Sequence, residues 1–86
     1  MSKIAEHYNG SVNTSGSDVT FSGTTDSIVV QCNTSGETLK IRLDDGTGYF
    51  TLTYRIPLTI FANATGINLV GSAATTLYEI IAIIES

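Results

Sequence analysis

Hydrophobic and polar residues alternate along most of the chain with the two-residue period of a β-strand that buries one face. In residues 39–43 (Leu-Lys-Ile-Arg-Leu), the three aliphatic side chains face one way and the two cations the other. Together with a weaker stretch near Val12, the pattern predicts seven or eight short strands. The other stretches with this period contain Val19 and Phe21; Ile28, Val30 and Cys32; Phe50, Leu52, Tyr54 and Ile56; Leu58 and Ile60; and Ile67 and Leu69.

Turn sequences separate these stretches. Asn-Thr-Ser-Gly occurs at 13–16 and again at 33–36, and Asn-Ala-Thr-Gly occurs at 63–66. Asn and Gly accept positive φ angles, and Asn and Ser side chains bond to the local backbone, so each segment is typical of a tight reversal between hairpin strands. The sequence Asp-Asp-Gly-Thr-Gly at 44–48 is a fourth reversal, which we expect to join the strand at 39–43 to one that begins at Tyr49.

Composition supports an all-β fold. The 86 residues include 13 Thr and ten Ile, which favour strands, and eight Gly with a single Pro. A chain of this length builds only one core. The prediction is therefore a single small antiparallel β-sandwich, jelly-roll-like, over residues 11–86. Residues 1–10 show no alternation and could form a short helical turn or an extended segment; we interpret them as an N-terminal arm that lies on a neighbouring molecule.

The last strand-like segment, residues 77–85, is apolar on both faces from Ile80 onward. A strand of an antiparallel sandwich normally keeps one face in water, so this segment is either central and covered on both sides or in contact with another subunit. A helix is a third alternative, because residues 77, 80, 81 and 84 also have helical spacing, but the β-branched residues favour a strand. We predict a homo-oligomer interface that combines one face of this segment with two side chains of the arm. Its residues are Tyr78, Ile80, Ala82, Ile84, Ile4 and Tyr8.

Charge argues against two classes of partner. Four Lys and Arg against eight Asp and Glu give a net charge of −4. No basic stripe is present that would neutralise phosphates or attract an anionic membrane, so we expect no nucleic-acid or membrane partner. Residues 1–7 lack the apolar stretch of a signal peptide, and the longest nearly apolar run, residues 80–84, is too short to cross a bilayer. These features favour a soluble protein that folds inside the cell.

Candidate chemistry in the sequence is sparse. A nucleophile could be assembled from Cys32 and His7, but Cys32 alternates with Ile28 and Val30, which places it on the core face. Asp44 and Asp45 resemble the start of a calcium loop, yet the spacing of the later ligands does not fit. We expect no enzyme activity, no cofactor and no metal. A small carbohydrate-binding module is the alternative function, with Tyr8, Tyr49 and Tyr78 as the aromatic side chains on which a sugar could stack.

Residues 33–43 (Asn-Thr-Ser-Gly-Glu-Thr-Leu-Lys-Ile-Arg-Leu), 48–52 (Gly-Tyr-Phe-Thr-Leu) and 66–72 (Gly-Ile-Asn-Leu-Val-Gly-Ser) resemble segments of small β-sandwich proteins on the virions of tailed bacteriophages. The resemblance is to head decoration (cement) and fibre-type domains, and it spans about residues 11–86. It implies a virion location for a protein made in the host cytoplasm, a non-enzymatic structural role and binding to a capsid or other virion protein by surface complementarity. It also implies a homo-oligomer, most often a trimer, and it assigns no role to an individual residue.

Overall fold

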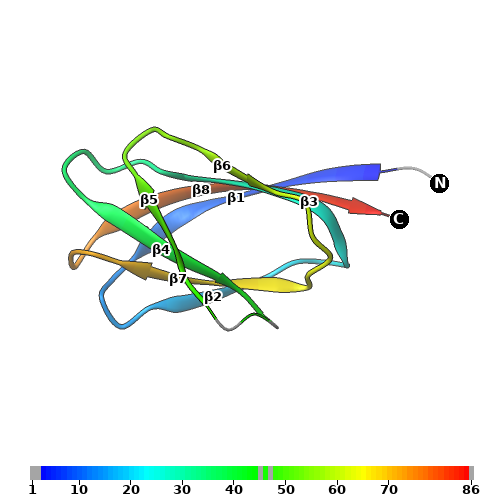
Figure 1. Cartoon of the computed structure of the whole chain (residues 1–86), viewed down its shortest axis with the longest axis horizontal. Coiled ribbons are helices and arrows are strands. Elements are labelled where there is room, and N and C mark those ends of the chain that lie inside the picture. Colours follow the sequence, from blue (N-terminus) through cyan, green and yellow to red (C-terminus); the bar gives the residue numbers. More distant parts are fainter. Residues whose placement is uncertain (1–2, 45, 47, 86) are drawn as a thin grey trace.

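The computed structural model describes residues 3–44, 46 and 48–85, and it contains eight strands in two four-stranded sheets. Sheet A has the order β1 (Lys3–Val12), β8 (Thr76–Glu85), β3 (Thr25–Cys32) and β6 (Leu58–Ile60). Sheet B has the order β2 (Ser17–Thr20), β7 (Gly66–Gly71), β4 (Thr38–Leu43) and β5 (Phe50–Thr53). Figure 1 shows β1 and β8 side by side and antiparallel, with the start of β1 and the end of β8 at the same end of the sandwich.

Neighbouring strands of both sheets pair antiparallel. Each strand is followed by one in the other sheet, except that β4 is followed by its own neighbour β5. Eight strands wound in this way, with sheet orders 1-8-3-6 and 2-7-4-5, form a jelly roll. The prediction of an all-β, jelly-roll-like antiparallel sandwich is confirmed.

The core lies between the two sheets and follows the predicted alternation. In β4, Leu39 and Ile41 are fully buried, whereas Lys40 between them is exposed. Cys32 is also fully buried and free, as its place in the row with Ile28 and Val30 predicts. Each sheet thus turns one row of β-branched and aliphatic side chains inward, which the hydrophobic effect stabilises. The buried apolar residues are Val12, Phe21, Ile28, Val30, Cys32, Leu39, Ile41, Leu52, Ala64, Ile67, Leu69, Ile80, Ala82 and Ile84.

The three similar turn sequences are not hairpin turns, so that part of the prediction is wrong. Segment 13–16 leads from β1 to β2, segment 33–36 from β3 to β4, and segment 63–66 from β6 to β7, and each of these steps changes sheet. The local chemistry is as expected: the Asn13 side chain accepts a bond of 2.9 Å from the Ser15 amide, and Gly16 has a φ of 88°. Such residues specify where the chain reverses, but not which strand it then pairs with.

The fourth reversal forms the expected hairpin, because β4 and β5 pair directly from Thr38↔Thr53 to Ile41↔Phe50. Asp45 and Thr47 of this reversal lie outside the described residues.

The expected N-terminal arm is instead part of the sandwich. Residues 3–12 form β1, which pairs with β8 over its whole length, from Lys3↔Glu85 to Val12↔Thr76. The predicted boundary between residues 10 and 11 therefore falls inside a strand. Alternation is hidden here because the inward positions include Glu6 and Gly10. Glu6 is accommodated by hydrogen bonds from Ser22 and Tyr8, which no local pattern reveals.

Candidate interaction surfaces

The sequence predicts an oligomer interface on one face of the last strand, β8. In the structure, this face points into the core. Ile80 and Ala82 have no exposed surface and Ile84 retains 4%. β8 is central in sheet A, between β1 and β3, so these side chains contact the opposite sheet. The interface prediction is wrong for these three residues, because two apolar faces cannot be told apart by a two-residue period alone.

The other three predicted interface residues also lie on the inner side of sheet A. Tyr8 packs against Phe21 with ring centroids 5.5 Å apart, and the Tyr78 ring covers Gly10, leaving little room for a Cβ there. Both tyrosines are half-buried. Ile4, at the end of β1, has 49% of its surface exposed. Of the six predicted residues, Ile4 therefore keeps the largest accessible apolar surface.

The opposite side of sheet A carries a group of exposed aliphatic side chains that the predicted interface did not include. In the strand register, Ile81 lies between His7 and Val29, and Ile83 lies beside Ala5. Ile81 is 41% exposed and Leu77 is 44% exposed. The only sequence signal was the second apolar row of the last strand. We name this surface the outer A face; it comprises Ala5, His7, Val29, Leu77, Ile81 and Ile83.

A polar cluster lies beside the exposed aliphatic side chains of the outer A face. His7 Nε2 is 2.7 Å from Glu79 Oε2, and Asn33 donates to Glu79 Oε1 at 3.4 Å. Gln31 in turn donates to the Asn33 side-chain oxygen at 2.7 Å. The hydrogen bond from His7, followed by that from Asn33, lowers the pKa of Glu79 from its usual value. The cluster links β1, β8 and the end of β3, and its Glu79 lies between Leu77 and Ile81 in the outer row of β8.

The nucleophile considered from the sequence does not form. His7 lies on the outer side of sheet A, and Cys32 lies on its inner side, with β8 between their strands. The Cys32 thiol points instead towards the carbonyl oxygens of Thr34 and Glu37, at 3.9 and 3.7 Å. Its surroundings are those of a small buried hydrophobe.

A second polar cluster fixes the 21–24 loop to the inner side of β1. Ser22 Oγ donates to Glu6 Oε2 at 2.5 Å, and Tyr8 Oη donates to Glu6 Oε1 at 2.5 Å. These bonds, that of Ser22 first, lower the pKa of Glu6. The same bond to Glu6 raises the pKa of Tyr8, because deprotonation would remove the donor. The arrangement holds a loop in place.

The outer side of sheet B is polar. Arg42 lies over the Tyr49 ring at 5.3 Å from its centroid, and Tyr49 donates to Asn68 at 3.2 Å. Asn68 donates to Asp18 at 2.8 Å. These contacts run across β4, β7 and β2, so the side chains of this surface bond mainly to one another.

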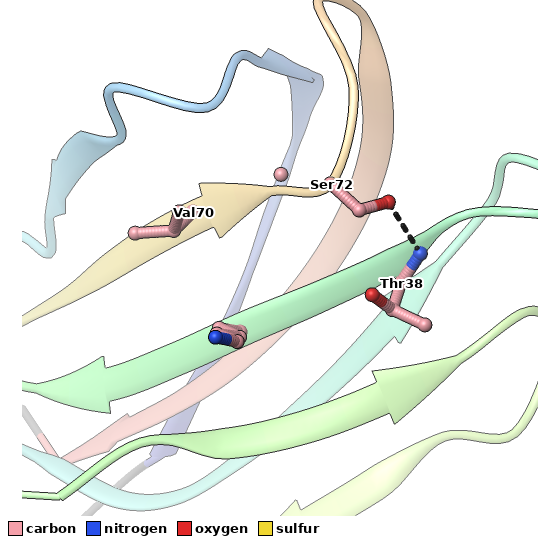
Figure 2. Close-up of a pocket in the computed structure, with 5 residues that line it drawn as sticks. Thr38, Val70 and Ser72 are labelled. Carbon is pink, nitrogen blue, oxygen red and sulfur yellow. Dashed lines mark hydrogen bonds between the residues drawn. The ribbon is translucent and has the colours of Figure 1, made fainter.

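A shallow depression of about 290 Å³ lies at one end of β4 and β7. In Figure 2, Ser72 reaches from the end of β7 to β4 and accepts a 2.8 Å bond from the main-chain N–H of Thr38. Ser72 also donates to Glu37 at 2.5 Å. Its hydroxyl is therefore already bonded within the chain, and no set of polar groups converges on the hollow. The depression is lined by Thr38, Lys40, Val70, Gly71 and Ser72.

The tyrosines proposed for sugar binding do not share a platform. Tyr8 and Tyr78 are half-buried on the inner side of sheet A, whereas Tyr49 precedes β5 of sheet B. Among the described residues, no three His, Cys, Asp or Glu side chains gather closely enough to hold a metal ion. The part of the chain that the structure describes contains no helix with the length and hydropathy needed to cross a membrane.

Comparisons of the chain with protein-family models, with curated proteins and with solved structures found no match. The surfaces described above therefore carry the functional argument.

Proposed function

We propose that the chain is a non-enzymatic structural protein of a virion, of the capsid decoration or cement type, which attaches to a capsid or other virion protein through its outer A face. The observation that carries this proposal is the group of aliphatic side chains on the outside of β8, an inner strand of sheet A, namely Leu77, Ile81 and Ile83. Ile81 and Leu77 are each more than 40% exposed there. An antiparallel sandwich normally presents polar side chains on its outer faces, so an exposed aliphatic row marks a surface with a partner.

The architecture agrees with this role. Jelly rolls are used in viral capsid domains, and they are also used in lectins. Architecture alone does not decide between the two, because one fold hosts many functions. The lectin alternative needs an exposed aromatic platform. The exposed aromatic side chains lie in and around β5 and after β6, whereas the exposed apolar side chains of the outer A face are aliphatic; the aromatic ones are Tyr49, Phe50, Tyr54 and Phe61. The outer A face combines exposed aliphatic side chains with the polar cluster around Glu79, and protein–protein interfaces have this mixture of apolar and hydrogen-bonding groups.

Capsid binding tests the proposal. Capsids of the virus that encodes this chain are assembled without it, incubated with the purified protein and sedimented. We expect the wild-type protein to co-sediment and Ile81→Lys to bind at least about tenfold more weakly, because a cation is then buried at the contact.

The matched control is Thr51→Lys, which places the same charge on an exposed position of the outer side of sheet B. It should bind like the wild type. Equal binding of the two variants, or no binding of the wild type, contradicts the proposal; unchanged thermal unfolding of both variants confirms that folding is not the cause.

A further inference from the structure

The four edges of the two sheets differ greatly in length. β6, β2 and β5 contain three, four and four residues, whereas β1 contains ten. Short edge strands protect a sheet from pairing with another chain, because they offer few free main-chain groups. β1 lacks this protection, and it has neither a proline nor a bulge in its pairing with β8.

The direction of the main-chain groups in β1 follows from the strand register. Leu77 O accepts a bond of 2.8 Å from the Asn33 amide, so the main-chain groups of Leu77 point towards β3. Since N–H and C=O groups of an antiparallel strand alternate in direction, those of Tyr78, Ile80, Ala82 and Ile84 point towards β1. Their opposite residues in β1 are Gly10, Tyr8, Glu6 and Ile4.

The intervening residues of β1 therefore direct their main-chain N–H and C=O groups away from the sheet. Their side chains are also exposed. Within the described part of the chain, the structure gives none of these main-chain groups a hydrogen-bond partner. The result is a row of unsatisfied donors and acceptors with the spacing of a β-strand. These residues are Ala5, His7, Asn9 and Ser11.

We propose that a second copy of this chain pairs with this edge, β1 against β1, antiparallel about a two-fold axis at Tyr8. In that register Ala5 is opposite Ser11 of the second copy and His7 is opposite its Asn9. Each opposed pair exchanges two bonds, so the four free residues of each copy make about eight main-chain hydrogen bonds. Two copies of sheet A then form one continuous sheet of about eight strands.

Side chains on the inner side of sheet A fit this register. Tyr8 lies opposite Tyr8 of the second copy, an aromatic cross-strand pair. Ile4, which is half exposed in one chain, lies opposite Val12 and gains an apolar neighbour. A slip of two residues would place Ile4 opposite Gly10 and lose this contact.

Charge also favours a second copy as the occupant. The chain carries a net charge of −4, yet β1 contains one cation, Lys3, and one anion, Glu6. Two copies therefore approach along a locally neutral edge, without the like-charge repulsion that their overall charge would cause elsewhere. The pairing leaves the outer A face uncovered, so the inference does not depend on the virion role. A two-fold pair also differs from the trimer that the phage resemblance implies.

Mass measurement by light scattering over micromolar to millimolar concentrations tests the pair. We expect the wild type to reach twice the chain mass of 9.1 kDa. A protein that stays monomeric throughout, or that forms a trimer, overturns the proposal.

Two double variants keep the test independent of folding. Ala5→Lys with Ser11→Lys places like charges opposite each other at both ends of the pairing, and it should weaken the dimer about tenfold or more. Ala5→Lys with Ser11→Glu places opposite charges there and should dimerise at least as well as the wild type. Equal association of the two variants contradicts the register. Both positions are exposed on the outer side, so both variants should fold.

Cross-linking fixes the register directly. Chains with His7→Cys and chains with Asn9→Cys are oxidised separately and as a mixture. The opposed Cα atoms are about 5.5 Å apart, within disulfide reach, so the mixture should give heterodimers. Each variant alone should cross-link much more slowly. Amide exchange of His7 and Asn9 provides a second measurement: it should slow as concentration rises, and concentration-independent exchange refutes the pairing.

Discussion

The two outer faces of this sandwich differ although the sheets behind them are alike. Both sheets have four antiparallel strands and turn a row of aliphatic side chains inward. The outer side of sheet B bonds internally, from Arg42 and Tyr49 through Asn68 to Asp18. The outer A face instead exposes Ile81 and Leu77 to solvent. Since one inward apolar row per sheet suffices for the core, we propose that a partner covers the exposed aliphatic side chains on the outside of β8.

Substitutions at two neighbouring residues of β8 should show the largest difference between the core and the outer A face. Ile80→Asp buries an unpaired charge in the core and should lower the free energy of unfolding by about 4 kcal/mol or more, enough to unfold a small domain. Ile81→Asp changes only the outer A face and should cost about 1 kcal/mol. Urea titrations followed by circular dichroism measure both. Similar losses in the two variants would mean that the outer A face is part of a core.

Thiols at a buried and an exposed position should also differ, with smaller expected losses of stability. Cys32→Ser places a hydroxyl among apolar core residues and should lower the free energy of unfolding by about 1–2 kcal/mol. In the native wild type, Cys32 should react slowly with a thiol reagent, because it is fully buried. An Ile81→Cys variant adds a thiol on the outer A face and should label one equivalent rapidly. Rapid labelling of the wild type would contradict the burial of Cys32.

The outer side of sheet B should tolerate substitution. Tyr49→Ala removes the contact with Arg42 and the hydrogen bond to Asn68, both at the surface, and should cost less than about 1 kcal/mol. Thr51→Ala, on an exposed position of the neighbouring strand β5, is the control and should leave the unfolding midpoint unchanged. A loss of several kcal/mol for Tyr49→Ala would show that this face also packs against something essential.

Sequence patterns predicted the inner side of the fold better than its outer side. Alternation correctly placed Leu39, Ile41, Val30 and Cys32 in the core, because burying one face imposes a period of two on a strand. It could not choose between the two faces of β8, since both are apolar from Ile80 onward. The choice depends on the register with β1 and β3, which is set by contacts far apart in the chain.

Two further features depended on tertiary contacts. The sequence predicts an arm in place of β1 because Glu6 occupies an inward position, where its bonds to Ser22, 16 residues away, compensate for the charge. Of the three Asn-x-x-Gly segments, 13–16 and 33–36 form turns with Gly16 and Gly36 at positive φ, whereas Gly66 already belongs to β7. Which sheet receives the next strand is decided by packing of the whole jelly roll. The sequence also does not show that β1 lies at a free edge, because an edge is defined only once all strands are paired.

The smallest expected effect concerns the polar end of the outer A face and its pH dependence. Hydrogen bonds, that from His7 first, hold the pKa of Glu79 below its usual value of 4.5 in the folded protein. A depressed carboxyl pKa adds stability that is fully present above the unfolded-state pKa and is lost as the pH falls through the folded value. Wild type and Glu79→Gln should therefore differ most at neutral pH and converge below about pH 4.5. Thermal unfolding between pH 3 and pH 7 measures the difference; because Glu6 is unchanged in both proteins, its own lowered pKa cancels. A difference that grows on acidification would show that the cluster on the outer A face does not stabilise the ionised carboxylate.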